Sequence, residues 1–179
     1  MLMQDINRTY KLLKGNKAKR IIGCLRAPGV HAMITFRFGQ WLNTQNILVK
    51  VILTPFYLFL YRRDRLWGIE IPRSATIGEG FYIGHYGGIT ISPNAKIGKN
   101  CNISQLVTIG VSGQGDKRGA PTIGDNVYIA PGAKLFGKIT IGNNVKIGAN
   151  AVVHKDIPDN AIVVLDPGFS IISYTGNIK

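Results

Sequence analysis

An aliphatic residue returns every six positions between residues 71 and 158, with small and polar residues in between. A period of six fits neither an α-helix nor the two-residue alternation of a flat strand, and it is typical of a parallel β-helix. We therefore expect triangular coils of three hexads, with the opening aliphatic side chain inside and Gly or Asn in the corner turns. The positions that open a hexad are Ile71, Ile77, Ile83, Ile91, Ile97, Ile103, Ile123, Ile129, Leu135, Ile141, Ile147 and Val153.

Two irregularities interrupt this repeat. From Ile83 to Thr90 the chain uses eight residues where six are expected, in the stretch IGHYGGIT. Residues 111–122 form a Gly-rich excursion that is too polar for the core. Since loops that leave a rigid scaffold commonly carry function, we expect the functional groups at these two places.

Residues 1–70 lack the six-residue period and favour helices. Residues 30–42 repeat apolar side chains at helical spacing, which predicts an amphipathic helix. Residues 47–61 are the most apolar stretch, but a membrane-spanning helix needs about 20 apolar residues. We expect a helix buried against the β-helix or a neighbouring subunit. The alternative is peripheral membrane contact through residues 47–65, with the basic end of this segment on anionic lipid.

The sequence thus divides into three parts. We expect a mainly β protein with an N-terminal helical segment at 1–70, a β-helix at 71–165 that includes the loop 111–122, and a tail at 166–179. The tail is expected to close the open end of the coil or to cross to a neighbour, because a stack of coils needs a cap.

Charge changes this picture only in the first part. The formal net charge is +13, and residues 1–70 hold 12 Lys or Arg against 3 Asp or Glu. This excess suits phosphates, an anionic glycan or a membrane surface, and ordinary solvated charge is an equal alternative. We expect no nucleic-acid partner. No signal peptide is visible, and Cys24 and Cys101 suggest no disulfide framework, so a reducing cytoplasm is the expected location.

His85 is the best catalytic candidate. It lies in the irregular corner between Gly84 and the pair Gly87–Gly88, and glycines allow close approach of a ligand. An imidazole can accept a proton near neutral pH. A corner histidine without function is the alternative, and His154 is interpreted as structural. A β-helix with a metal centre needs several histidine ligands, so no metal is expected.

Four stretches carry a resemblance to a known family: GIEIPRSATIG, FYIGHYGGITIS, NISQLVTIGVSGQGDKRGAPTIGDN and IAPGAKLFGKITIGNNVKIGANAVV. They resemble the serine acetyltransferase branch of the hexapeptide-repeat acyltransferases, and most closely its short polysaccharide O-acetyltransferases of colanic-acid and capsule pathways. The resemblance covers about residues 27–164. It implies a left-handed β-helix and a homotrimer with acetyl-CoA, the cosubstrate, in the grooves between subunits.

The resemblance also implies roles for single residues. His85 matches the general base, which takes the proton of an acceptor hydroxyl that attacks the thioester directly. A backbone N–H near Gly110 would hold the oxyanion. The residues implied in coenzyme binding are Gly110, Ala130 and Ala149 through backbone groups, and Lys117, Arg118, Lys134 and Lys146 toward the phosphates.

The departures from the family pattern bear on the acceptor. The branch places Asp before its histidine, where this chain has Gly84, and its loop reads Arg-His-Pro, where this chain has Arg118–Pro121. The residues after the last coil, from Asp166 to Gly168, also depart. These losses favour a neutral saccharide acceptor, so the sequence predicts an O-acetyltransferase of surface-polysaccharide biosynthesis. Serine O-acetyltransfer and a non-catalytic trimeric scaffold are the alternatives.

Overall fold

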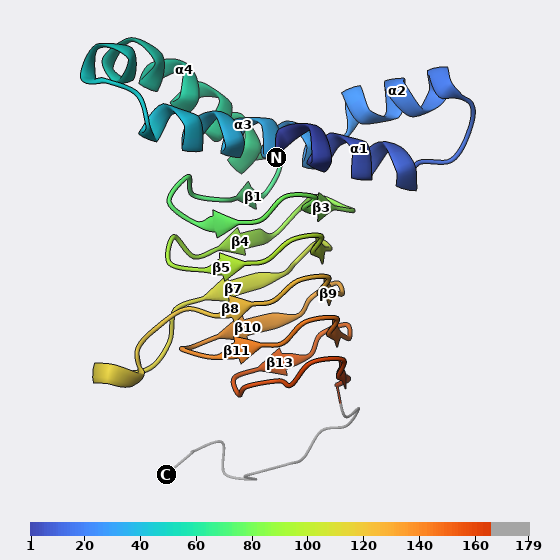
Figure 1. Ribbon diagram of the computed structural model, residues 1–179, viewed down its shortest axis with the longest axis vertical. Coiled ribbons are helices and arrows are strands. Elements are labelled where there is room, and N and C mark those ends of the chain that lie inside the picture. The colour runs from blue at the N-terminus through green and yellow to red at the C-terminus, as the bar shows by residue number, and fades with distance from the viewer. Residues whose placement is uncertain (166–179) are drawn as a thin grey trace, which may run out of the picture.

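The computed structural model describes residues 1–165, and the expected closing tail at 166–179 lies outside them. Four helices come first, followed by fourteen short strands (Figure 1). The helices are α1 (Leu2–Leu12), α2 (Lys17–Arg26), α3 (Pro28–Asn43) and α4 (Ile47–Leu66). The strands are β1 (Ile69–Glu70), β2 (Thr76–Ile77), β3 (Tyr82–Ile83), β4 (Ile89–Ile91), β5 (Lys96–Ile97), β6 (Asn102–Ile103), β7 (Thr108–Gly110), β8 (Thr122–Ile123), β9 (Tyr128–Ile129), β10 (Lys134–Phe136), β11 (Thr140–Ile141), β12 (Lys146–Ile147), β13 (Val152–Val153) and β14 (Ile162–Val163).

The strands form three parallel sheets, which are the faces of a triangular prism. Sheet A has the order β1-β4-β7-β10-β13, sheet B the order β2-β5-β8-β11, and sheet C the order β3-β6-β9-β12-β14. The register stacks one hexad opening on the next, as in the column Ile83, Ile103 and Ile129, and these side chains are buried. The predicted left-handed parallel β-helix is confirmed.

Asparagines build the corner between sheets B and C. Asn100, Asn126, Asn144 and Asn160 all have φ between 55° and 62°, a conformation that Asn tolerates better than most residues. Their side chains also bond along the stack, since the Asn126 amide donates to Asn144 Oδ1 at 3.2 Å and the Asn144 amide to Asn160 Oδ1 at 3.0 Å. The polar corner residues of the repeat therefore stabilise the stacking of coils.

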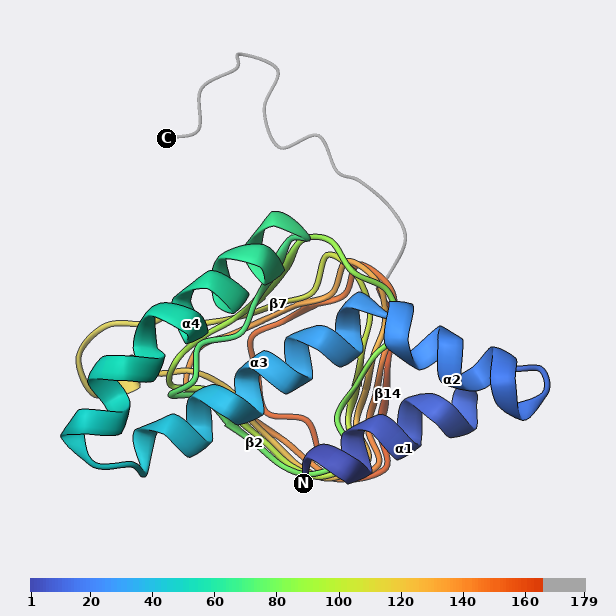
Figure 2. The same ribbon diagram turned by 90° about the horizontal axis from the view of Figure 1, so that it is seen from above.

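Helix α3 closes the N-terminal end of the prism, where it crosses the triangle (Figure 2). Its buried Met33 and Phe36 join the same core cluster as Ile69 and Phe81 of the first coil. Gly29 permits the contact, because a Cβ there would lie 2.6 Å from the carbonyl oxygen of Ile83. The helix predicted at 30–42 is confirmed, and it begins at Pro28 in the first turn, where proline is favoured.

Helix α4 differs from the expectation. It extends to Leu66, and only Tyr57 and Asp64 of its residues are buried. Burial against the β-helix, one of the two expected packings of this segment, is wrong, because α3 already covers the end of the coil and α4 packs along α3 and β1. Burial of α4 against a neighbouring subunit stays a prediction. Within residues 1–165, no helix combines the length and the hydropathy that crossing a bilayer would require.

A buried ion pair joins α1 to both α3 and the first coil. Asp5 and Arg37 are 2% and 8% exposed, and Arg37 Nε donates to Asp5 Oδ2 at 2.9 Å. The carboxylate also accepts from the Phe81 N–H at 2.9 Å, and Arg37 donates to the carbonyls of Ile77 and Gly78. Three segments of the chain therefore meet at one satisfied charge pair.

We expect Asp5→Asn to lower the free energy of unfolding by about 3 kcal/mol, because it leaves the Arg37 charge buried without its counter-ion. Urea denaturation followed by circular dichroism measures the loss. Replacement of exposed Lys11 on the same helix by Gln is the matched control. Equal stability of Asp5→Asn and the control would contradict the role of this pair.

Candidate active site

His85 projects from the edge of the prism between sheets C and A, hereafter the His85 edge. This edge stacks residues 84–88, 104–106, 130–132 and 148–150 of successive coils. Backbone bonds hold the stack in register: the Leu106 N–H donates to the Gly87 carbonyl at 2.8 Å, and the Gly132 N–H donates to the Gln105 carbonyl at 3.0 Å. His85 therefore lies on a regular and well-connected scaffold.

The two extra residues of the first corner push His85 outward. Ile83 pairs with Ile103, and Ile91 pairs with Ile109. The chain therefore uses eight residues on this coil to cover the distance that six residues cover on the next coil. His85 and Tyr86 are both exposed as a result. Gly88 allows the detour, because its φ is 66° and a Cβ there would lie 2.6 Å from Leu106 Cδ2.

The structure offers a reason for Gly84 in place of an acidic residue. A Cβ at Gly84 would lie 3.3 Å from Cε1 of the Tyr82 ring, so a larger side chain would have to displace that ring. Among residues 1–165, no side chain forms a hydrogen bond with the His85 ring. The small residue at position 84 therefore has a local packing reason.

Glu70 is a carboxylate that the sequence reasoning did not single out. It faces outward from β1, pairs in register with Thr90, and lines a hollow of about 230 Å³ with Gly88 and Arg65. Burial raises the pKa of nearby Tyr61, and the charge of Glu70 raises it further. The pairing of β1 with β4 places Glu70 beside the His85 corner, although the two residues are 15 positions apart in the chain.

The excursion after β7 forms a short hairpin at the opposite edge of sheet A, hereafter the loop edge (Figure 1). Ser112 and Gly119 exchange two backbone hydrogen bonds, of 3.1 and 3.0 Å, and Gly115–Lys117 forms a 3-10 turn at the tip. Lys138 Nζ donates to the Asp116 carbonyl at 3.1 Å. The first two bonds close the hairpin, and the bond from Lys138 ties its tip to the prism.

A pocket of about 560 Å³, hereafter the loop pocket, lies between this hairpin and the last coils. Its floor contains Phe136 and Gly137, and His154 stacks on Phe136 with ring centroids 6.1 Å apart. Lys117 and Lys138 supply positive charge at the rim of this pocket, and Asp116 also lines it. His154, interpreted from sequence as structural, therefore lines a pocket; only the sheet register, which stacks β13 on β10, brings it there.

The residues predicted to bind the coenzyme fall into two groups, with Lys146 apart from both. Ala130 and Ala149 lie on the His85 edge, and Lys134 reaches it by donating a hydrogen bond to the Leu106 carbonyl. Gly110, Lys117 and Arg118 lie at the loop edge, across the width of sheet A. Lys146 is exposed on the face of sheet C, in register with Tyr128. A single chain does not bring His85 and the loop together.

Neither cysteine is placed to act as a nucleophile. Cys101 is fully buried, and burial raises its pKa to about 11; burial also raises the pKa of the Cys24 thiol. The thiolate is the reactive form of cysteine, so these raised pKa values lower the reactivity of both side chains. No group of three or more His, Cys, Asp or Glu side chains that could hold a metal ion occurs in residues 1–165.

Comparison with known proteins gives consistent matches. Residues 120–155 match the family model of the bacterial transferase hexapeptide (six repeats). The serine acetyltransferase of Bacillus pumilus is 45% identical over 175 residues, which cover 96% of this chain and 76% of that protein. The serine acetyltransferase of Synechococcus elongatus is 38% identical over 141 residues, and the match spans 79% of this chain but only 56% of that relative.

Solved structures agree with the sequence matches. Serine acetyltransferase isoform 3 of Entamoeba histolytica, in complex with cysteine, superposes with a TM-score of 0.74 at 33% identity, covering 96% of this chain and 59% of that one. The Neisseria gonorrhoeae serine acetyltransferase in complex with serine gives a TM-score of 0.73 at 30% identity, covering 93% and 66%.

Proposed function

Because this chain belongs to the serine acetyltransferase family of hexapeptide-repeat transferases, we propose that it transfers the acetyl group of acetyl-CoA to the hydroxyl of L-serine. The family match carries the choice of acceptor. The exposed His85 on its rigid corner carries the chemistry, since it is the histidine that the irregular coil presents to solvent.

The prediction of a saccharide acceptor and a role in polysaccharide biosynthesis is wrong. The relatives from Bacillus pumilus and Synechococcus elongatus, and the solved structures, are serine acetyltransferases. The two departures that favoured a sugar, Gly84 and the stretch Arg118–Pro121, therefore do not identify the acceptor. At Gly84 the packing of Tyr82 gives a local reason for the small residue.

In the proposed reaction, His85 acts as general base. Its imidazole takes the proton of the serine hydroxyl while the oxygen attacks the thioester carbonyl carbon. The C–S bond then breaks, the acetyl group stays on the serine oxygen, and the coenzyme thiolate leaves and recovers the proton from the imidazolium. The proposed transfer is direct and needs no cysteine nucleophile; both cysteines are buried, and burial raises the pKa of both thiols. Glu70, in the hollow beside the corner, is our candidate for stabilising the imidazolium.

The loop edge fits the coenzyme. Lys117 and Lys138 at the rim of the loop pocket offer charge to phosphates, which such side chains bind well. Gly110 leaves the adjoining backbone open, since the nearest side-chain atom to a Cβ there would be 3.8 Å away. These residues, with Arg118 in the loop, would hold acetyl-CoA and present its thioester along the prism wall.

The separation of the two edges favours a homotrimer. His85 lies at one edge of sheet A and the loop at the other, so the base and the coenzyme groups meet only if the His85 edge of one chain packs beside the loop edge of the next. We therefore place the reaction in grooves between chains. Ala130, Ala149 and Lys134 then line the side of the groove that carries His85, whereas Lys146, on the face of sheet C, belongs to neither edge.

Removal of residues 113–119 tests the coenzyme site. Ser112 and Gly119 are directly hydrogen-bonded, so Ser112 can be joined to Ala120 with little disturbance of the coil. We expect the deletion to weaken acetyl-CoA binding by about tenfold or more, because it removes two cationic side chains and one wall of the pocket. Isothermal titration calorimetry with acetyl-CoA measures the loss.

Release of coenzyme thiol with L-serine as acceptor tests the activity itself. Light scattering shows whether the deletion variant keeps the mass of the unaltered protein, which separates loss of binding from loss of assembly. Unchanged acetyl-CoA affinity after the deletion would remove the loop from the site. Binding of acetyl-CoA without any turnover of L-serine would contradict the proposed acceptor.

A further inference from the structure

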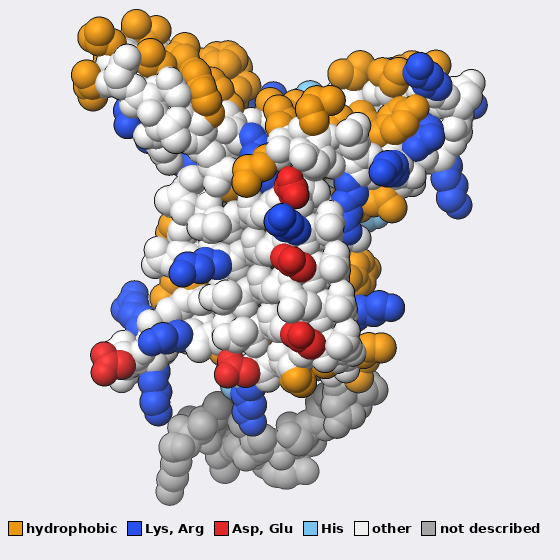
Figure 3. Space-filling model, viewed as in Figure 1, with side chains coloured by type: hydrophobic (Ala, Val, Ile, Leu, Met, Phe, Trp, Pro, Cys, Tyr) orange, Lys and Arg blue, Asp and Glu red, His pale blue; other side chains and the backbone are white. Residues whose placement is uncertain are grey.

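The helices carry a large apolar surface on the side away from the β-helix, hereafter the outer helical face. Figure 2 shows the four helices spread as one layer over the end of the prism. Figure 3 shows hydrophobic side chains along the outer margin of this layer, over α4 at one end and over α2 at the other. The most exposed side chains on α4, each at least 66% exposed, are Ile47, Leu48, Val51, Ile52, Phe59 and Leu66.

The exposed arc of α4 contains no polar side chain over its first three turns. Between Ile47 and Phe59, every position in the exposed class is apolar, and the polar residue Lys50 is half-buried. The exposed Arg62 and Arg65 appear only in the last turns. A helix that faces water carries polar residues on that side, so this face suits a partner that is not water.

The charge of the layer has one sign. Residues 1–66 contain 12 Lys or Arg and 2 Asp, a net charge of +10. Both carboxylates are buried and paired, Asp5 with Arg37 and Asp64 with Arg63. The helices therefore expose cationic and apolar side chains but no acidic one, and the acidic side chains in Figure 3 all lie on the β-helix below.

We propose that the outer helical face docks on the surface of an anionic lipid bilayer, with the apolar arc of α4 in the interface. An apolar helix face with a cationic border is the pattern of interfacial membrane binding. A second copy of the chain would place two surfaces of the same charge against each other, whereas anionic headgroups attract this charge at about 1 kcal/mol per residue.

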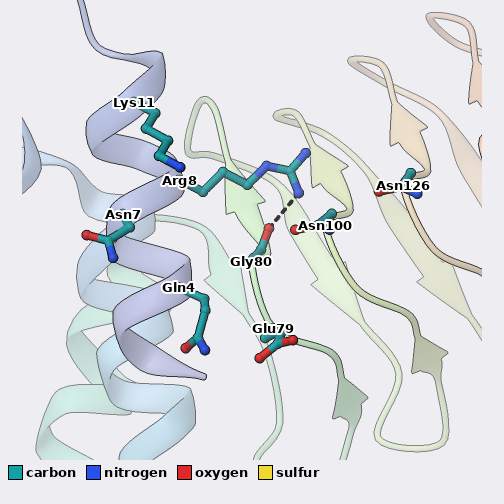
Figure 4. A pocket seen from close by; sticks show the side chains of 8 residues that line it. All are labelled: Gln4, Asn7, Arg8, Lys11, Glu79, Gly80, Asn100 and Asn126. Atoms are coloured by element: carbon teal, nitrogen blue, oxygen red, sulfur yellow. Dashed lines mark hydrogen bonds between the residues drawn. The ribbon is translucent and has the colours of Figure 1, made fainter.

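The pocket between α1 and the β-helix is a weaker candidate for a binding site. It measures about 510 Å³ and is lined mainly by amide and basic side chains, among them Asn7, Arg8 and Lys11, together with the acidic Glu79 (Figure 4). Arg8 already donates to the Gly80 carbonyl at 2.7 Å, so its charge is partly engaged by the protein. The pocket is open, and no buried polar group points to a ligand there, so we assign it no role.

Co-sedimentation with lipid vesicles tests the docking proposal. We expect the full chain to sediment with vesicles of phosphatidylcholine mixed with phosphatidylglycerol and to stay in solution with phosphatidylcholine alone. Ile52→Glu should weaken the binding by about tenfold or more, because it places a charge in the apolar arc. Lys14→Gln with Lys17→Gln should weaken it by about fivefold per lysine.

A matched control distinguishes vesicle binding through the outer helical face from non-specific adsorption of the protein. Ile162 is 70% exposed on β14, in the coil farthest from the helices, and Ile162→Glu should leave vesicle binding unchanged. Absent binding to the anionic vesicles, or equal binding to both kinds, would overturn the proposal. So would a lipid-free assembly that Ile52→Glu dissociates, since that result assigns the face to a second copy. The assay is independent of serine acetylation, which needs no vesicles.

Discussion

Replacing His85 by alanine should lower the turnover number by about 10²–10⁴-fold, the usual contribution of a general base. In the His85→Ala variant, the serine hydroxyl would have to lose its proton to water because the imidazole is gone. A coupled assay of coenzyme thiol release with saturating acetyl-CoA and L-serine measures the effect.

The fold should survive this change. His85 is exposed, and the corner is held by the backbone bond from Leu106 to Gly87 and not by the imidazole ring. We therefore expect an unchanged melting temperature and unchanged acetyl-CoA affinity. His154→Ala is the informative comparison: it removes a ring that stacks on Phe136 in the loop pocket, so it should raise the Michaelis constant for acetyl-CoA more than it lowers turnover. Full turnover in His85→Ala would remove this residue from the mechanism.

Placing a charge at Ile103 should prevent folding. Ile103 is 1% exposed, and in sheet C it is stacked between Ile83 and Ile129. An aspartate there would be buried with no hydrogen-bonding partner from the surrounding aliphatic side chains, which we expect to cost more than about 5 kcal/mol. Since domains are stable by about 5–15 kcal/mol, the variant should be insoluble or lack a cooperative thermal transition.

The same substitution at an outward position is the control. Ile162→Asp changes a side chain that is 70% exposed, so the protein should remain soluble and melt cooperatively. Circular dichroism at increasing temperature compares the two variants. A soluble Ile103→Asp protein with a normal transition would show that the hexad register assigned to sheet C is incorrect.

The two interruptions of the repeat were readable from sequence, but their relation in space was not. Both the detour at His85 and the loop after β7 follow from counting residues against a period of six. Whether Gly110 lies near His85 depends on which strands share a sheet, and the structure places them at opposite edges of sheet A. Glu70 was missed and His154 was interpreted as structural for the same reason: their neighbours come from other coils.

The sequence alone determined the β-helix, because a buried position repeated every six residues leaves one geometry in which all those side chains face the same interior. It also determined the corner that presents His85, since two extra residues flanked by glycines have to leave the coil. Only the tertiary structure decided the environment of the helices. Periodicity reports which face of a segment is apolar, but α3 covers the end of the prism and leaves no core for α4, so its apolar arc faces outward. What a segment packs against depends on the space that the other segments have already filled, and local sequence does not encode that space.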